Sequence, residues 1–576
     1  MAPLLIWQGE TGPKHKLHDP KDINNTLGKK IRIIKLRNYL VGVNNLEKTC
    51  IDLLLLGVTN ESLKSQLSNK NYQNPIPSLL HSSILSDTPT ESTLLLPEQH
   101  LHQRKKYNKN KNGSWSGKIQ WLFFKSLPVI GTYLLQYSLQ LASIFTLGHL
   151  GQIELAGAAL AAMFASVSAW SLTFGTTTAL DTLCSQAWTA ARDKTLVGIH
   201  LQRALIILAI IYIGFIIPFW WNRTYLRYLL LGAPPFIAFE GLKKYLQAQG
   251  IMRASTYVLL FASPLNFLIN YTLVHAKPVC LGYIGAPIAT SLSYWIMLLL
   301  LILYTCKLEG LEAWGGWSKD ALKNWGPFLR LAIPGALMLC SEWWAYQITA
   351  LATAYLGRIN LATQSILLTI IGTSFQIPFA ISIAAANRVG NSLGECFALK
   401  AKRASLVPMV FAACFGLLNC LFFMINRSFI GYLFTREEEV IENFYHAMPS
   451  CAFFVIADSL NAIVAGVIRG LGHQRIAAWI SIGANYLLAL PLAYILTFHL
   501  GYKLSGLWGG MAVALYVSSI GQSAYVFFVN WDSEVKRIRY SMKAEEIRIL
   551  EPDHEEQDII APFMLTPTTS RTSGMI

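Results

Sequence analysis

Two acidic residues lie inside long apolar stretches of this chain. Glu342 occurs within LAIPGALMLCSEWWAYQITALATAYLG and Asp458 within FFVIADSLNAIVAG. If these stretches cross a membrane, each carboxylate costs at least about 2.5 kcal/mol to insert, so it indicates a function. A facing pair of carboxyl groups can share a proton. Such a group binds either a proton or an organic cation, which is the chemistry of exchange between the two.

The residues around these acids extend the candidate site. Trp343 and Tyr346 flank Glu342, and aromatic faces beside a carboxylate suit an organic cation. Asn461 follows Asp458 by three residues and is included in the predicted site. A competing interpretation for both acids is a carboxylate that is hydrogen-bonded to a neighbouring helix for packing alone.

Two further acidic residues are predicted to have structural roles. Glu240 stands beside Lys243 and Lys244, a spacing typical of a local ion pair on one helix face. Asp181 follows an apolar stretch, and we expect it to brace a helix end at the membrane surface. Neither is predicted to belong to the transport site.

The composition predicts a membrane protein. Of 576 residues, 53% are hydrophobic and 14% are charged, whereas soluble domains carry about 25% charged residues. The net charge of +15 lies in tails and connectors and reflects membrane topology, not nucleic acid binding. No phosphate-binding loop, HExxH, G-x-S-x-G or histidine–cysteine cluster occurs. We therefore expect no enzyme, no cofactor and no metal site.

The hydropathy pattern contains twelve stretches that approach the roughly 20 apolar residues needed to span a bilayer. They are residues 127–148, 155–178, 201–220, 230–249, 255–274, 282–305, 327–355, 362–385, 404–425, 445–468, 475–498 and 505–529. Lys and Arg are concentrated in alternate connectors, including Arg469 and Arg475. The positive-inside rule therefore places both termini in the cytosol.

An internal repeat divides these stretches into two sets of six. Pro128 and Pro334 are 206 residues apart, and GHLGQIELAGAAL at 148–160 resembles AYLGRINLATQSI at 354–366. Farther along, AQGIMR matches GLGHQR. Parallel repeats of this kind are typical of transporters that move one half against the other around a central substrate site.

Five motifs in this order carry a resemblance to a known family. The stretches GHLGQIELAGA, GTTTALDTLCSQAW, LCSEWWAY, PFAISIAAANRVGNSLG and GVIRGLGHQ resemble eukaryotic, and particularly fungal, multidrug and toxic compound extrusion (MATE) transporters. The resemblance implies a twelve-helix, two-lobed antiporter that exports organic cations or other amphiphiles against a proton or sodium gradient.

The resemblance also implies roles for particular residues. The family's glutamate on the seventh helix matches Glu342, its acidic position on the tenth helix matches Asp458, and a glutamine on the first helix matches Gln136. Trp343 and Tyr346 match the aromatic residues after the glutamate. Animal relatives often have a second glutamate where this chain has Gln347, which leaves one negative charge fewer.

Together these observations predict an all-α integral membrane protein with two pseudo-symmetric six-helix lobes. The expected domains are a cytosolic tail (1–118), an N-lobe (119–320), a C-lobe (321–530) and a C-terminal cytosolic tail (531–576). The expected function is proton-coupled export of small organic solutes by a monomer in the lipid bilayer of the vacuole or plasma membrane. ESTLLL at 91–96 fits an acidic dileucine pattern, which would route the protein to a vacuole; the competing interpretation is an ordinary run of leucines in the tail. The alternatives are sodium coupling, a flippase for lipid-linked precursors, or a membrane sensor or scaffold.

Overall fold

Helices account for the regular structure in the part of the chain that the computed structural model describes, residues 115–276 and 281–550. Apolar segments that cross a membrane must satisfy their backbone hydrogen bonds internally, and the helix does so. The predicted tail over 1–118 lies outside the described residues except for its last four positions. The dileucine pattern also lies outside them.

The first half of the described chain runs from residue 115 to residue 307. Its elements are α4 (Trp115–Gly148), α5 (Gln152–Ala165), η3 (Ser166–Trp170), α6 (Ser171–Ala190), α7 (Leu196–Ile211), η4 (Tyr212–Ile216), α8 (Ile217–Trp220), α9 (Thr224–Leu229), η5 (Leu230–Gly232), α10 (Ala233–Ala248), α11 (Ala254–His275), η6 (Gly282–Ile284) and α12 (Gly285–Lys307). Several of these follow one another without a break, so the half comprises six continuous helical stretches.

The second half follows two short turns, η7 (Leu311–Ala313) and η8 (Lys319–Leu322). Its elements are α13 (Trp325–Ala354), α14 (Arg358–Gly394), α15 (Ala398–Phe434), α16 (Glu438–Leu471), α17 (Gln474–Ile482), η9 (Gly483–Ala489), α18 (Leu490–Tyr494), η10 (Ile495–His499) and α19 (Lys503–Phe528). These again form six continuous stretches, and a further helix, α20 (Trp531–Leu550), comes after them.

All twelve predicted spans coincide with helical stretches. Within the described residues, nine of these stretches are long and apolar enough to cross a membrane; the others are α4, α9–α10 and α13. The helices extend several residues beyond the predicted spans, as in α14 and α15. The all-α membrane fold class predicted from the sequence is confirmed.

The repeat is visible in the backbone. Pro128 and Pro334 lie inside α4 and α13, the first helices of the two halves. Gly250 and Gly472 follow α10 and α16 with φ angles of +85° and +79°. This left-handed region is accessible to glycine at little cost, so the repeated glycine ends the fourth helix of each half in the same way.

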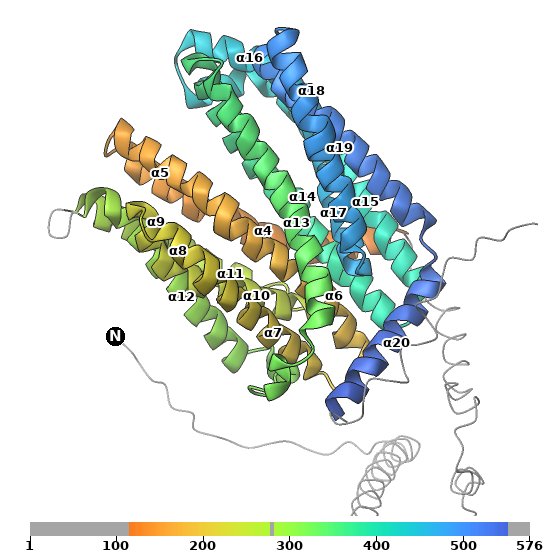
Figure 1. The fold of residues 1–576 in the computed structure, drawn as a ribbon. Coiled ribbons are helices and arrows are strands. Elements are labelled where there is room, and N and C mark those ends of the chain that lie inside the picture. Colours follow the sequence, from red (N-terminus) through yellow and green to blue (C-terminus); the bar gives the residue numbers. More distant parts are fainter. Residues whose placement is uncertain (1–114, 277–280, 551–576) are drawn as a thin grey trace, which may run out of the picture. The chain divides into compact units, whose positions relative to one another are not determined.

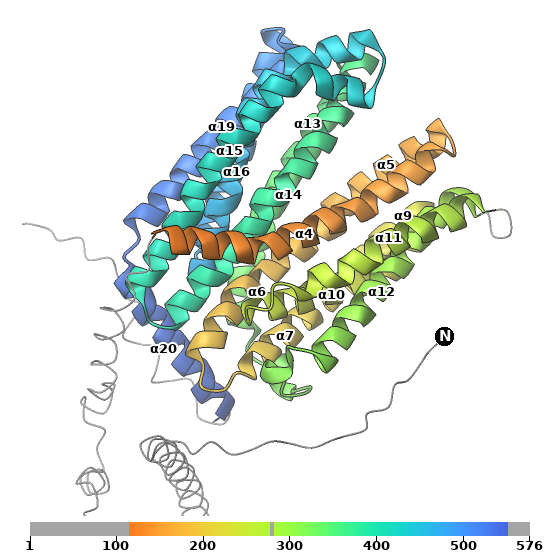
Figure 2. The same ribbon diagram turned by 180° about the vertical axis from the view of Figure 1, so that it is seen from behind.

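The helices of each half pack mainly on one another, and we call the two groups the N-half (α4–α12) and the C-half (α13–α19). In Figure 1 the N-half is orange to lime and the C-half green to blue, and Figure 2 shows α4 running across from one group to the other. Helix α4 packs on α14, while α6 packs on α13, α14 and α16. Helices α4 and α6 therefore join the halves.

Small residues let α6 approach the C-half closely. A Cβ atom added to Gly335 of α13 would lie 2.1 Å from Oγ1 of Thr178. One added to Gly390 of α14 would lie 2.0 Å from Oγ of Ser185. Close contact through small side chains is the usual way in which helices associate in membranes, and we call this contact the α6 seam.

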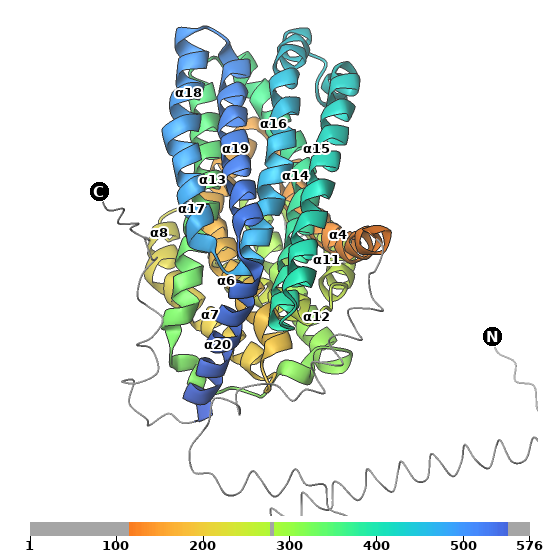
Figure 3. The ribbon, with the colours of Figure 1, turned by 90° about the vertical axis from the view of Figure 1, so that its right-hand side faces the viewer.

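The sequence analysis did not predict α20, which occupies the first part of the expected C-terminal tail. Figure 3 shows α20 at one end of the helices, which we call the α20 end. Its residues Trp531, Ile538 and Met542 are buried, and it packs on α6, α14 and α15. Spacings of seven and four residues place these side chains on one face of the helix.

An ion pair and a hydrogen bond fix α20 to the two halves. Glu545 lies 2.6 Å from Arg203 of α7 in the N-half. Glu534 lies 3.0 Å from His473, which follows α16 of the C-half, and 2.7 Å from Arg537. Burial alone would raise the pKa of Glu534, but its hydrogen bond with His473 and the charge of Arg537 outweigh burial and lower that pKa.

Candidate functional site

A cavity of about 310 Å³ lies between the two halves. It is lined by α4, η3, α6, α10 and α12 of the N-half and by α13, α14, α16 and α19 of the C-half. Five of the seven predicted site residues line it: Gln136, Trp343, Tyr346, Gln347 and Asp458. The cavity therefore brings together most of the residues that the sequence analysis selected.

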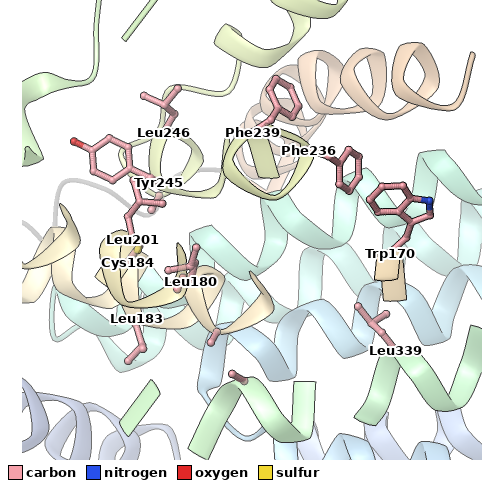
Figure 4. Packing of buried hydrophobic residues seen from close by; sticks show 14 of the residues in the cluster. Trp170, Leu180, Leu183, Cys184, Leu201, Phe236, Phe239, Tyr245, Leu246 and Leu339 are labelled. Atoms are coloured by element: carbon pink, nitrogen blue, oxygen red, sulfur yellow. The ribbon is translucent and has the colours of Figure 1, made fainter. Parts of the chain in front are cut away.

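The walls of this cavity are mainly aromatic. Trp170 and Phe236 lie with ring centroids 4.4 Å apart, and the close view in Figure 4 shows their side chains next to each other. Tyr294 packs on Phe236 at 4.9 Å, and Trp508 of α19 lines the cavity from the C-half. The sequence analysis missed these four residues, because aromatic residues are common in any apolar helix.

The polar lining includes four amides and one acid, beside the hydroxyl groups of a serine and several tyrosines. Besides Asp458, the cavity is lined by the glutamines Gln136, Gln140, Gln347 and Gln376. Amides both donate and accept hydrogen bonds, so they can orient a polar solute without selecting for a particular charge on it. Asp458 is the only carboxylate that lines this cavity among the described residues.

Tyr346 connects the two predicted acids. Its hydroxyl donates a hydrogen bond to Oδ1 of Asp458 at 3.3 Å, and it also interacts with the carboxyl group of Glu342 one helical turn away. Both carboxyl groups are buried, with 7% of Glu342 and 3% of Asp458 exposed. Oε1 of Glu342 has no hydrogen-bond partner among the described residues. Glu342 thus lies behind the cavity wall, and Asp458 faces the cavity.

Gln136 belongs to a polar network in the N-half. Its side-chain nitrogen donates to Oε1 of Glu240 at 2.8 Å, and its oxygen accepts from Nζ of Lys243 at 3.1 Å. Lys243 lies 2.6 Å from Glu240, which confirms the local pair predicted on this helix. The pair is fully buried, and Gln136 joins it to the cavity.

Asn461 lies outside the cavity. It accepts hydrogen bonds from Ser518 at 2.9 Å and from Gln522 at 3.1 Å, both on α19. These contacts join α16 to α19 within the C-half. Asn461 therefore supports the helix that carries Asp458 but does not line the cavity.

Asp181 and Arg469 differ most from the expectations. Both were placed at helix ends or in connectors, but both lie inside helices and are buried, Asp181 in α6 and Arg469 in α16. Nε of Arg469 lies 3.8 Å from the Asp181 carboxylate, and Lys244 of α10 lies 2.9 Å from it. Asp181 thus forms an ion-pair bridge between the halves. The charge of Arg469 also interacts with that of Glu342.

Further hydrogen bonds surround this bridge. Thr182 donates to the backbone oxygen of Arg469, and Gln474 donates to the oxygen of Thr178 at 3.2 Å. Gln186 donates to the oxygen of Gly470 at 3.1 Å. The halves are therefore joined by polar contacts on the side of the cavity where α20 lies.

In the described part of the chain, twelve helical stretches of membrane length form two repeated halves with a cavity between them, which is the architecture of a membrane transport protein. A family model described as MatE matches residues 128–226, 221–272 and 334–495. The chain belongs to this MATE family of transporters, as its five motifs indicated.

Curated relatives and solved structures agree with this assignment. An uncharacterized transporter of Schizosaccharomyces pombe is 37% identical over 441 residues, which cover 73% of this chain and 81% of that protein. Multidrug and toxin extrusion protein 2 of Oryctolagus cuniculus is 31% identical over 441 residues, 73% of this chain and 72% of that protein. The crystal structure of the eukaryotic MATE transporter AtDTX14 matches with a TM-score of 0.68 and 28% identity, covering 74% of this chain and 99% of that chain.

Proposed function

We propose that this transporter exports organic solutes in exchange for protons, with Glu342 and Asp458 as the coupling site. The observation that carries the proposal is the Tyr346 hydroxyl, which joins the two buried carboxyl groups at the wall of the cavity. A proton that enters this site changes the charge next to the solute. Solute binding and proton binding therefore compete, which is the requirement for exchange.

The cavity supports an aromatic or amphiphilic solute with at most one positive charge. Its aromatic walls suit flat apolar groups and cations, and Asp458 is the one acid of the described residues that faces it. Lys243 lies buried under the ring of Tyr133, 4.3 Å from its centroid. Because Glu240 neutralises Lys243, Asp458 supplies the one carboxylate charge that faces the cavity within the described residues, so a solute with several positive charges is disfavoured. The name of the Oryctolagus cuniculus relative, multidrug and toxin extrusion protein 2, is in line with such solutes.

The direction of transport and the location complete the proposal. Following the positive-inside rule, the α20 end faces the cytosol together with both termini. Export then runs from the cytosol into the vacuole or across the plasma membrane. The halves defined above correspond to the two lobes that alternate access to the cavity, in a transporter that works as a monomer and not as an enzyme.

Uptake into proteoliposomes tests the proposal. The purified protein is reconstituted, a pH gradient is imposed, and accumulation of a fluorescent monocationic dye is measured. Glu342→Gln and Asp458→Asn should each abolish accumulation driven by the pH gradient, because neither amide can take up a proton. Glu442→Gln is the matched control, since this exposed glutamate contacts only His446, 4.0 Å away, among the described residues.

Two outcomes would contradict the proposal. Full pH-driven accumulation by Glu342→Gln would show that the carboxyl pair does not couple proton movement to solute movement. Accumulation driven by a sodium gradient at equal pH on both sides, and lost in both variants, would assign the site to sodium.

A further inference from the structure

A second cavity, of about 770 Å³, lies at the α20 end and shares no described lining residue with the transport cavity. Its walls come from α6 of the N-half, from α13 and α17 of the C-half, and from α20, the helix at one end of the bundle in Figure 3. A ligand bound in this α20 cavity would therefore contact both halves and α20 at once.

The α20 cavity combines apolar walls with basic side chains. The apolar walls include Leu183, Leu331, Ile476, Ile538 and Met542. The basic lining consists of His473 and the arginines Arg330, Arg475 and Arg537. This chemistry suits a ligand that has both negative charge and hydrocarbon.

Two of these arginines are available for a ligand. Arg330 and Arg475 are exposed, and neither has an ion pair or side-chain hydrogen bond with another residue in the part of the chain that the structure describes. Arg537 is engaged by Glu534 and donates to the backbone oxygen of Leu471 at 2.8 Å. The positive charge that a ligand can use is therefore that of Arg330 and Arg475.

The acidic group in the lining does not cancel this charge. Glu545 is the one carboxylate that lines the α20 cavity within the described residues. It is buried and lies 2.6 Å from Arg203 of α7, which neutralises it. The α20 cavity thus keeps a net positive charge toward an incoming anion.

The helices that carry the two free arginines show lipid-facing surfaces next to them. On α13, Ile333 and Leu337 follow Arg330 by three and seven residues and are 55% and 50% exposed, so all three lie on one helix face. On α17, Trp479 follows Arg475 by four residues and is 74% exposed. Exposed apolar side chains on a membrane helix face the lipid chains, and tryptophan is enriched at the level of the headgroups.

This arrangement places the arginines where a lipid headgroup would lie. Seven residues of helix span about 10 Å, so Arg330 stands one and a half to two turns beyond the apolar side chains on its own face. Basic pockets between membrane helices bind anionic lipid headgroups. A soluble phosphate would use the arginines but would leave the apolar walls and the adjoining lipid-facing surfaces without a role.

We propose that the α20 cavity binds an anionic phospholipid. The phosphate-bearing headgroup pairs with Arg330 and Arg475, and the hydrocarbon next to it packs on the apolar walls. Because these walls belong to both halves, the bound lipid opposes separation of the halves. Only this last effect rests on the proposed function.

Thiol accessibility in the full-length chain tests the binding directly. Ser541 lines the α20 cavity and is exposed, so Ser541→Cys reports whether the cavity is occupied. Ser533→Cys, at an exposed position of α20 outside the lining, is the matched control. The nine native cysteines are replaced by serine or alanine, and alkylation by an uncharged maleimide is timed in nanodiscs.

Replacing part of the phosphatidylcholine in the nanodiscs by phosphatidylserine should slow alkylation of the Ser541→Cys thiol about tenfold. The rate at the Ser533→Cys thiol should not change, which separates occupation of the cavity from an effect of membrane surface charge. Arg330→Gln with Arg475→Gln should abolish the protection. Each arginine near the headgroup contributes about fivefold to the affinity, so their joint loss should weaken binding about 25-fold.

Lys536→Gln with Lys543→Gln is the matched control for the arginines. These two lysines are exposed on α20 and do not line the cavity, so the variant loses the same charge at the same end of the protein. It should keep the protection by phosphatidylserine.

Three results would overturn the proposal. One is a rate at the Ser541→Cys thiol that phosphatidylserine does not change. Another is equal loss of protection in the arginine and lysine variants, which would reduce the effect to surface charge. The third is equal protection by glycerophosphoserine, the headgroup without acyl chains, in phosphatidylcholine nanodiscs, which would assign the cavity to a soluble phosphate compound.

The lipid site and the proton-exchange site can fail separately. The alkylation measurement needs no transported solute and no gradient, so a negative result in the proton-exchange assay leaves it unaffected. If both hold, dye accumulation should be slower in proteoliposomes that contain phosphatidylserine than in phosphatidylcholine alone. The variant that lacks Arg330 and Arg475 should then accumulate dye at the same rate in both.

Discussion

Removing the charge of Asp181 should favour opening of the α20 end. In Asp181→Asn the carboxylate no longer faces Arg469, whose Nε lies 3.8 Å from it across the halves. Two opposite charges at that distance attract by about 4 kcal/mol at an effective dielectric constant of 20. Lys244 lies in the same half as Asp181, so its contact does not change when the halves separate.

Part of this attraction is recovered when the end opens. Arg469 keeps its hydrogen bond to Ser382 of the C-half at 2.8 Å, and water reaches both charges. In the variant, Lys244 and Arg469 are also left as like charges in one buried region. We therefore expect a net shift of about 2–3 kcal/mol toward the open form, which is roughly a 30- to 150-fold change in the equilibrium constant.

Double electron–electron resonance measures this shift. Spin labels at Lys307→Cys and Lys402→Cys report the separation of the two halves, because both positions are exposed and lie at the end of α12 and the start of α15. The nine native cysteines are replaced by serine or alanine, so that only the two introduced positions carry labels. Asp181→Asn should increase the population at long distances.

Glu240→Gln is the matched control for this charge removal. Glu240 is equally buried and paired, but its partners Lys243 and Gln136 belong to the same half. Both variants should lose thermal stability, whereas only Asp181→Asn should shift the distances. Equal distance distributions in the two variants would refute the assignment of Asp181 as a bridge between the halves.

Three other substitutions give separate tests. Gln347→Glu adds a second carboxylate to the cavity wall and should lower the KM for dicationic solutes about tenfold in proteoliposome uptake, and an unchanged KM would place Gln347 away from the solute. Tyr346→Phe loses a hydrogen bond worth about 1.5 kcal/mol and should slow pH-driven uptake roughly tenfold; an unchanged rate would separate the hydroxyl from coupling. Glu534 has a folded pKa below its ordinary value of 4.5, so the stability that it adds to α20 docking is present above that pH and is lost as pH falls through the folded pKa. Fluorescence of the buried Trp531 should report this release on acidification, and Glu534→Gln should lose that pH dependence; release at the same pH in the variant would contradict the role of the carboxylate.

The helices could be predicted because a bilayer imposes a length and a hydropathy. Glu342 and Asp458 were identified for the same reason, since a carboxylate stands out within an apolar run. Their connection through Tyr346 required the packing of α13 on the rest of the C-half. No spacing in the sequence indicates that contact, because the residues are 112 positions apart.

Arg469 and α20 show where the sequence reasoning failed. An arginine near the end of an apolar run was assigned to a connector, since basic residues are frequent there. Here α16 continues to Leu471, and the carboxylate of Asp181 compensates for the burial of Arg469. Helix α20 is polar on one face and too poor in apolar residues for a hydropathy scan. The buried face of α20 can be recognised only from the packing of this helix on α6, α14 and α15.

The composition of the α6 seam affects the free energy that is needed to separate the two halves during transport. Residues that meet there include Thr178, Ser185, Gly335 and Gly390, which carry little or no hydrocarbon. In the alternating access proposed above, water enters as the halves part, and such surfaces are hydrated at small cost, since the hydrophobic cost scales with the apolar area exposed. Larger aliphatic residues at the same positions would expose more apolar area to water, and this exposure would cost free energy in every transport cycle. The α6 seam can therefore pack closely in the closed state and still be hydrated at a small cost in free energy when the halves separate.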